Sequence, residues 1–173
     1  MTRRATDDDR PSRQPPETAR TDYTGAVYGS LLAASVVAGA SAQSQFPRLH
    51  LVLLLLCTGL VFWAAHAYAH LVGDRPRHEP VTWREIRHVC AREWPIAQAA
   101  ILPAVAVAIS PLLSLSLRGG AWLALGVAVG QQVLWASAAV LRAGASRPTV
   151  VSAGAVNLVL GLIIVAAKAA LQH

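Results

Sequence analysis

Apolar residues along the chain are gathered into five long runs that are separated by shorter polar segments. Each run is long enough to cross a hydrocarbon core of about 30 Å as a helix that rises about 1.5 Å per residue. The runs cover residues 24–43, 49–72, 95–117, 120–141 and 150–171. The pattern predicts an all-α fold, a polytopic transmembrane helix bundle of five spans, which forms one transmembrane domain over residues 24–173.

The polar segments before and between these runs have different predicted structures. Residues 1–23 are rich in charge and proline, so we expect a disordered cytoplasmic tail that is too polar for a signal peptide. In the long segment after the second run, Thr82 stands three residues before Glu85, which is the spacing of a capping box. Basic residues such as Arg84 and Arg87 then alternate with apolar ones. We expect a cytoplasmic amphipathic helix there, lying at the membrane interface.

Glycine and proline modify the predicted spans. Gly25 and Gly29 are four residues apart in the first run, and such pairs let helices approach closely in lipid. Pro103 and Pro111 interrupt the third run, and each removes a backbone hydrogen bond. We therefore expect a tightly packed first helix and a kinked or broken third one.

Composition and charge set the location and orientation of the chain. Hydrophobic residues make up 54% of it and charged residues 14%, and the clustering of the former leaves too few residues for a soluble domain. Of the 15 basic residues, 12 lie in the tail and in the segments after the second and fourth runs. The positive-inside rule then places the N-terminus in the cytoplasm. We expect the basic charge to contact membrane lipid rather than nucleic acid. Lys168 can snorkel to the outer interface and need not be a buried charge.

Two histidines stand out in the second run, "LVFWAAHAYAHLV". At 100° per residue, His66 and His70 share one helix face with Gly59 and Trp63. Imidazole titrates near neutral pH, so this face suits a proton relay or a small-ligand site. It also suits an interfacial belt of amphipathic side chains, or packing against another helix. Both interpretations remain open at this point.

Other polar residues near or within the runs are secondary candidates for a polar path. Glu93 precedes the third run at the depth of His70, and its alternative role is a solvated carboxylate at a helix start. Gln98, Gln131 and Asn157 lie deeper, where amides ordinarily form interhelical hydrogen bonds.

No catalytic or metal-binding pattern is found in the chain. The motifs GxSxG, HExxH, the Walker loop and GxGxxG are absent. Two histidines are too few for a metal site, and Cys57 and Cys90 form no CxxC pair. We therefore expect no enzymatic activity, no metal and no cofactor.

Three stretches, "VYGSLLAASVV", "LVFWAAHAYAHLV" and "AVNLVLGLIIVAAKAAL", occur in a chain that has almost no lysine. With these features the chain resembles the small multi-pass membrane proteins of high-GC actinobacteria. The resemblance implies a location in the bacterial inner membrane and supplies no activity.

Together these patterns favour a small channel-like or transporter-like membrane protein, which we expect to be a homo-oligomer or to bind a partner membrane protein. The rival interpretation is a non-transporting scaffold or accessory subunit that acts through helix–helix contacts.

Overall fold

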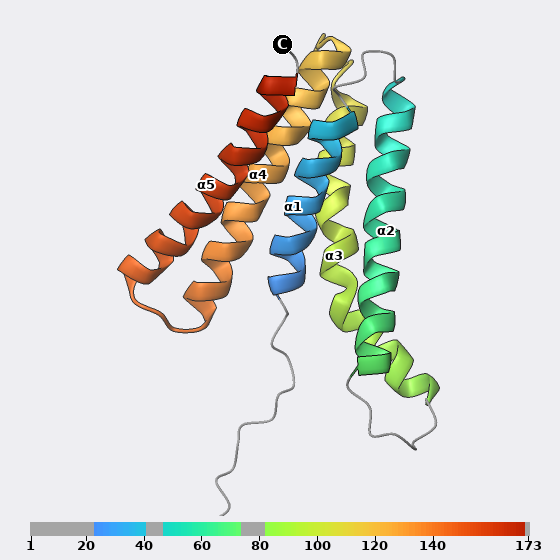
Figure 1. Cartoon of the computed structure of the whole chain (residues 1–173), viewed down its shortest axis with the longest axis vertical. Helices are drawn as coiled ribbons and strands as arrows, with labels where there is room; N and C mark the ends of the chain where they lie inside the picture. The colour runs from blue at the N-terminus through green and yellow to red at the C-terminus, as the bar shows by residue number, and fades with distance from the viewer. Residues whose placement is uncertain (1–22, 41–46, 74–81, 172–173) are drawn as a thin grey trace, which may run out of the picture.

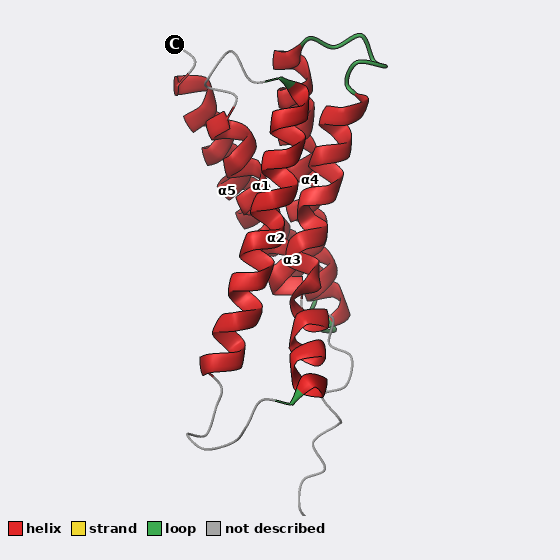
Figure 2. Cartoon of the chain, turned by 90° about the vertical axis from the view of Figure 1, so that its right-hand side faces the viewer, coloured by secondary structure: helices red, strands yellow, loops and turns green. Residues whose placement is uncertain are grey.

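The computed structural model of the chain describes residues 23–40, 47–73 and 82–171. These residues form five helices and contain no strand (Figure 2). The helices are α1 (Tyr23–Ala40), α2 (Arg48–Gly73), α3 (Trp83–Ile109), α4 (Leu117–Arg142) and α5 (Arg147–Leu171). The predicted all-α bundle is confirmed. The predicted tail lies outside the described residues except for Tyr23, which begins α1.

Successive helices run in opposite directions, so the bundle has two chemically different ends (Figure 1). One end holds the starts of α1, α3 and α5, and we call it the arginine-rich end. It carries Arg84, Arg87, Arg92, Arg142 and Arg147. The opposite, arginine-poor end carries Arg48 and Arg118.

Four helices of the described chain, α1, α2, α4 and residues 147–170 of α5, are long and apolar enough to cross a membrane. Large apolar side chains such as Leu60 on α2 and Ile163 on α5 are more than half exposed, as lipid-facing residues are. A bundle with this much exposed apolar surface is a helical membrane protein.

The third helix differs from its prediction. The sequence predicted an interfacial helix followed by a separate span from residue 95 to residue 117. The structure instead has one continuous helix, α3, that begins after Thr82 and ends at Ile109. Thr82 caps it as predicted, since the Thr82 side chain accepts a hydrogen bond from the Glu85 amide. Because of its charged first third, α3 is not among the four helices that are apolar enough by composition.

Prolines act on α3 in two ways. The helix continues through Pro95 and Pro103, and Figure 1 shows α3 bend in its arginine-rich half. Pro95 lies in that half and cannot donate to the carbonyl four residues earlier, which favours a bend there. Pro111 has no N–H to donate to the Val107 carbonyl oxygen, which accepts from the Ser110 amide instead, and α3 ends at Ile109.

The bundle core lies toward the arginine-poor end and is made mainly of alanine and other small residues. α1, α3 and α4 pack against one another, α2 packs mainly on α3, and α5 packs mainly on α4. Representative core residues are Ala34 and Val37 on α1, Leu55 on α2 and Ala124 on α4. Toward the arginine-rich end the α4–α5 pair diverges from α2 and α3 (Figure 1).

Glycines allow the closest helix contacts, as the spacing in the first run predicted. A Cβ atom on Gly29 would lie 2.7 Å from the Ile96 carbonyl oxygen of α3. A Cβ atom on Gly59 of α2 would lie 2.8 Å from the Ala100 Cβ atom. α3 is therefore held between two glycine surfaces, which fixes its position relative to both neighbours.

Candidate functional site

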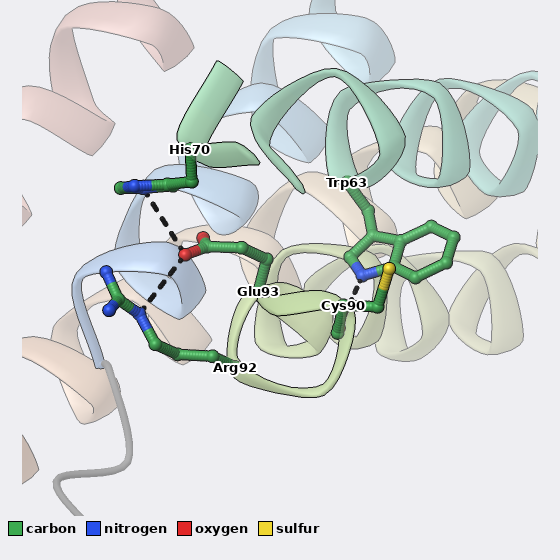
Figure 3. A network of polar contacts seen from close by, with 5 residues as sticks. All are labelled: Trp63, His70, Cys90, Arg92 and Glu93. Carbon is green, nitrogen blue, oxygen red and sulfur yellow. Dashed lines mark hydrogen bonds and ion pairs between the residues drawn. The ribbon is translucent and has the colours of Figure 1, made fainter. Parts of the chain in front are cut away.

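A buried carboxylate lies near the arginine-rich end of the bundle. The Glu93 side chain on α3 is 4% exposed, and its Oε1 atom accepts no hydrogen bond. His70 Nε2, from the last turn of α2, lies 3.4 Å from this oxygen, and Arg92 Nε lies 3.5 Å from it (Figure 3). We call His70, Arg92 and Glu93 the Glu93 cluster.

Local packing between α2 and α3 places this cluster. Trp63 Nε1 donates a hydrogen bond of 2.9 Å to the Cys90 carbonyl oxygen (Figure 3). The Trp63 ring also stands edge-on to Trp94, with 5.4 Å between the ring centroids. Gly59, one turn further along the same face, lets α3 approach closely. The predicted face of Gly59, Trp63 and His70 is thus the face that contacts α3.

The second predicted histidine has a different partner. His66 lies against Tyr28 of α1, with 5.2 Å between the ring centroids. Tyr28 also contacts Phe62 of α2 at 6.4 Å. His66 therefore packs at the α1–α2 contact, whereas His70 pairs with α3. The hypothesis that both imidazoles serve one ligand finds no support in this arrangement.

Gln131 joins the three central helices deep in the bundle. Its Nε2 atom donates hydrogen bonds of 3.1 Å to Ser30 Oγ on α1 and to the Ala99 carbonyl oxygen on α3. Ser30 Oγ in turn donates to the Ala26 carbonyl oxygen at 2.8 Å. Ser30 was not a candidate at the sequence level, because a serine in a small-residue helix resembles its glycine and alanine neighbours.

The remaining two predicted amides, Asn157 and Gln98, have different surroundings. Asn157 on α5 is half-buried, and both its Oδ1 atom and its backbone oxygen accept from Gln132 Nε2 at 3.1 Å. Gln132 itself is fully buried. Gln98 lies on the exposed side of α3. The structure thus brings neither Gln98 nor Asn157 to the Glu93 cluster.

Lys168 is a polar residue whose placement the sequence predicted wrongly. The sequence suggested that Lys168 can snorkel to the outer interface and need not be buried, but its side chain is fully buried and its Nζ atom lies 4.7 Å from the centroid of the Trp122 ring. A sequence pattern does indicate this burial, because Lys168 continues a helical stripe of small and polar residues along α5. The stripe consists of Gly154, Asn157, Gly161 and Lys168, and each of these residues contacts α4.

These contacts limit what each group does chemically. The deep amides are engaged in helix–helix hydrogen bonds and hold the bundle together. In the Glu93 cluster the Glu93 side chain is buried, whereas the His70 side chain is 36% exposed within the single chain. Among the described residues, no group of three or more His, Cys, Asp or Glu side chains is arranged for a metal ion.

Comparison with protein-family models, with curated proteins and with solved structures finds no match to this chain. Its function is therefore inferred from its own residues and their geometry.

Proposed function

We propose that the protein is a small transporter-like or channel-like protein of the bacterial inner membrane, in which the Glu93 cluster binds and releases protons at the cytoplasmic end. The observation that carries the proposal is the burial of Glu93 at 4% exposure with His70 Nε2 at 3.4 Å. Ionisable residues at membrane depth are costly and typically mark ion or proton pathways.

Proton binding follows from how the cluster compensates its charge. A buried carboxylate that accepts no hydrogen bond at Oε1 depends on nearby cations for stabilisation. Arg92 supplies a permanent positive charge, while His70 supplies one only when it is protonated. The aromatic ring that α1 contributes near this end of α2 is Tyr28, which contacts His66 and brings no charge to the cluster. The charge balance around the buried Glu93 carboxylate therefore depends on whether His70 carries a proton.

The orientation rests on the distribution of arginine. The arginine-rich end carries five described arginines against two at the other end, and the positive-inside rule favours the cytoplasm for the richer side. The N-terminus is then cytoplasmic, and the Glu93 cluster exchanges protons with the cytosol. Homo-oligomerisation is part of the proposal, because α2 and α5 each have one side free of other helices of the chain.

A proton-flux assay in liposomes tests this function. Full-length protein is reconstituted with a pH-sensitive dye inside, and a pH step is applied. Flux is expected in the wild type and should fall about tenfold or more in Glu93→Gln and in His70→Ala, because each removes one partner of the His70–Glu93 contact. His88→Ala is the matched control, since His88 is an exposed histidine on α3.

The scaffold is retained as a second candidate function because of α4. Gly126 and Gly130 are exposed on this helix, and a Cβ atom on either would meet nothing within 4 Å. Such a face suits a contact with another membrane helix. Absence of flux at every pH in a correctly folded wild type would reject the transport proposal and leave the scaffold.

A further inference from the structure

Lys168 has an environment that no other part of the proposed function explains. It lies in the last turn of α5, with no exposed side-chain surface and its Nζ atom 4.7 Å from the Trp122 ring centroid. The Nζ atom has no hydrogen-bond partner within the described residues. An ammonium group has three donors, and a contact with a ring face satisfies its charge only in part.

The chain offers no carboxylate side chain to neutralise Lys168. All nine acidic residues precede residue 94, and none lies between residues 23 and 73. Consequently α1, α4 and α5, which meet in this part of the bundle, carry no Asp or Glu side chain. A buried ammonium without a paired charge strongly destabilises the folded state. Binding of an anion from outside the chain would therefore stabilise this part of the bundle.

Two other positive groups lie at the same end of the bundle, at the starts of α2 and α4. Arg48 donates through Nη2 to the Leu115 carbonyl oxygen, but its Nε atom is buried without a hydrogen-bond partner. Arg118 lies in the first turn of α4, a helix of 26 residues whose N-terminal amides add a partial positive charge. Trp122 lies on the same helix, within its second turn.

We propose that Lys168 and Trp122 form an anion site at the arginine-poor end, which binds a phosphate group. Phosphate combines negative charge with several acceptor oxygens, which suits an ammonium that has unused donors. The position of Lys168 along α5 also suits a lipid phosphate. The helix ends three residues beyond Lys168, and tryptophan side chains such as Trp122 favour the headgroup region of the membrane. In this proposal the four-carbon stem of Lys168 lets Nζ leave its buried position beside the Trp122 ring and reach a headgroup at that level.

The phosphate can come from a lipid headgroup or from free phosphate, and binding measurements separate the two. Purified full-length protein in a neutral detergent is titrated with phosphatidylglycerol, with inorganic phosphate and with a neutral lipid that lacks phosphate. Native mass spectrometry counts the bound lipid, and the unfolding temperature reports binding of either probe. A response to phosphatidylglycerol alone assigns the site to lipid, and a response to both probes assigns it to phosphate groups in general.

Lys168→Met is the decisive variant, because it keeps the length of the side chain and removes its charge. We expect its affinity for the responding probe to fall about tenfold, and Lys168→Arg to restore it. The matched control is Arg142→Met, since Arg142 lies over the Tyr23 ring at 5.2 Å at the other end of the bundle. If Lys168→Met does not fold, Lys168→Gln replaces it. The proposed site would be overturned if the wild type and the Lys168→Met or Lys168→Gln variant bound every probe equally well. It would also be overturned if neither protein bound any probe.

Discussion

Gln98 and Gln131 show how the surroundings of one residue decide its role. Both are uncharged amides in long helices of the bundle, yet Gln98 is exposed and Gln131 is buried between three helices. Gln131 donates two hydrogen bonds that join α4 to α1 and α3. The sequence predicted amides that bond between helices, but it could not say which ones, because facing residues depend on which helices become neighbours.

Gln131→Leu is expected to lower the free energy of unfolding by about 1 kcal/mol, since two interhelical hydrogen bonds of about 0.6 kcal/mol each are lost. Gln98→Leu is the matched control and should change it by less than about 0.5 kcal/mol. Reversible unfolding in mixed detergent, followed by circular dichroism, measures both. Equal losses in the two variants would contradict the assigned roles.

Part of the Glu93 cluster was predictable from the sequence of α2. The helical spacing placed Gly59, Trp63 and His70 on one face, and this face does contact α3. The separation of His66 from His70 was not predictable, because it depends on Tyr28 reaching α2 from α1. Whether the cluster carries protons stays a prediction until flux is measured.

At the scale of the helix, α3 is the element that organises the bundle. Its first third packs Cys90 and Glu93 against α2, and its middle lies between the glycines of α1 and α2. The sequence correctly predicted the Thr82 cap, but it divided the helix in two at Pro95. A proline near the end of an amphipathic stretch resembles a boundary in sequence, although packing against α2 and α1 holds the helix continuous across it.

Gly29→Ala tests the close approach of α1 and α3. Its new Cβ atom would lie 2.7 Å from the Ile96 carbonyl oxygen and 2.9 Å from the Ala99 Cβ atom, so the helices must separate. We expect a loss of about 1–3 kcal/mol in the free energy of unfolding, as for other overpacked sites. Gly39→Ala, where a Cβ atom meets nothing within 4 Å, should be neutral or stabilise by up to about 1 kcal/mol. The same detergent titration compares the two, and an undisturbed Gly29→Ala would be inconsistent with the packing.

For the whole molecule, the five long apolar runs were predictable as helices, although the structure joins the predicted interfacial helix to the third run in α3. Their pairing was not, since nothing in an apolar run states which neighbour it contacts. The bundle has α1, α3 and α4 at its centre, with α2 and α5 on the flanks. This arrangement leaves one charged end with the Glu93 cluster and one end with Lys168 and no acidic side chain.

The central claim is that α3 crosses the membrane as a fifth span, with the Glu93 cluster on the cytoplasmic side. Arg87 and Leu112 are exposed just beyond the two ends of the crossing part of α3, so each is replaced by cysteine in a chain without Cys57 and Cys90. A membrane-impermeant maleimide is then applied to intact bacteria that express each variant.

The account predicts that Leu112→Cys is labelled in intact cells and that Arg87→Cys is labelled only after the cells are opened. Labelling of both in intact cells, or of neither, would place the two ends of α3 on one side and contradict a fifth crossing. The reversed pattern would place the Glu93 cluster outside the cell and contradict its proposed exchange with the cytosol.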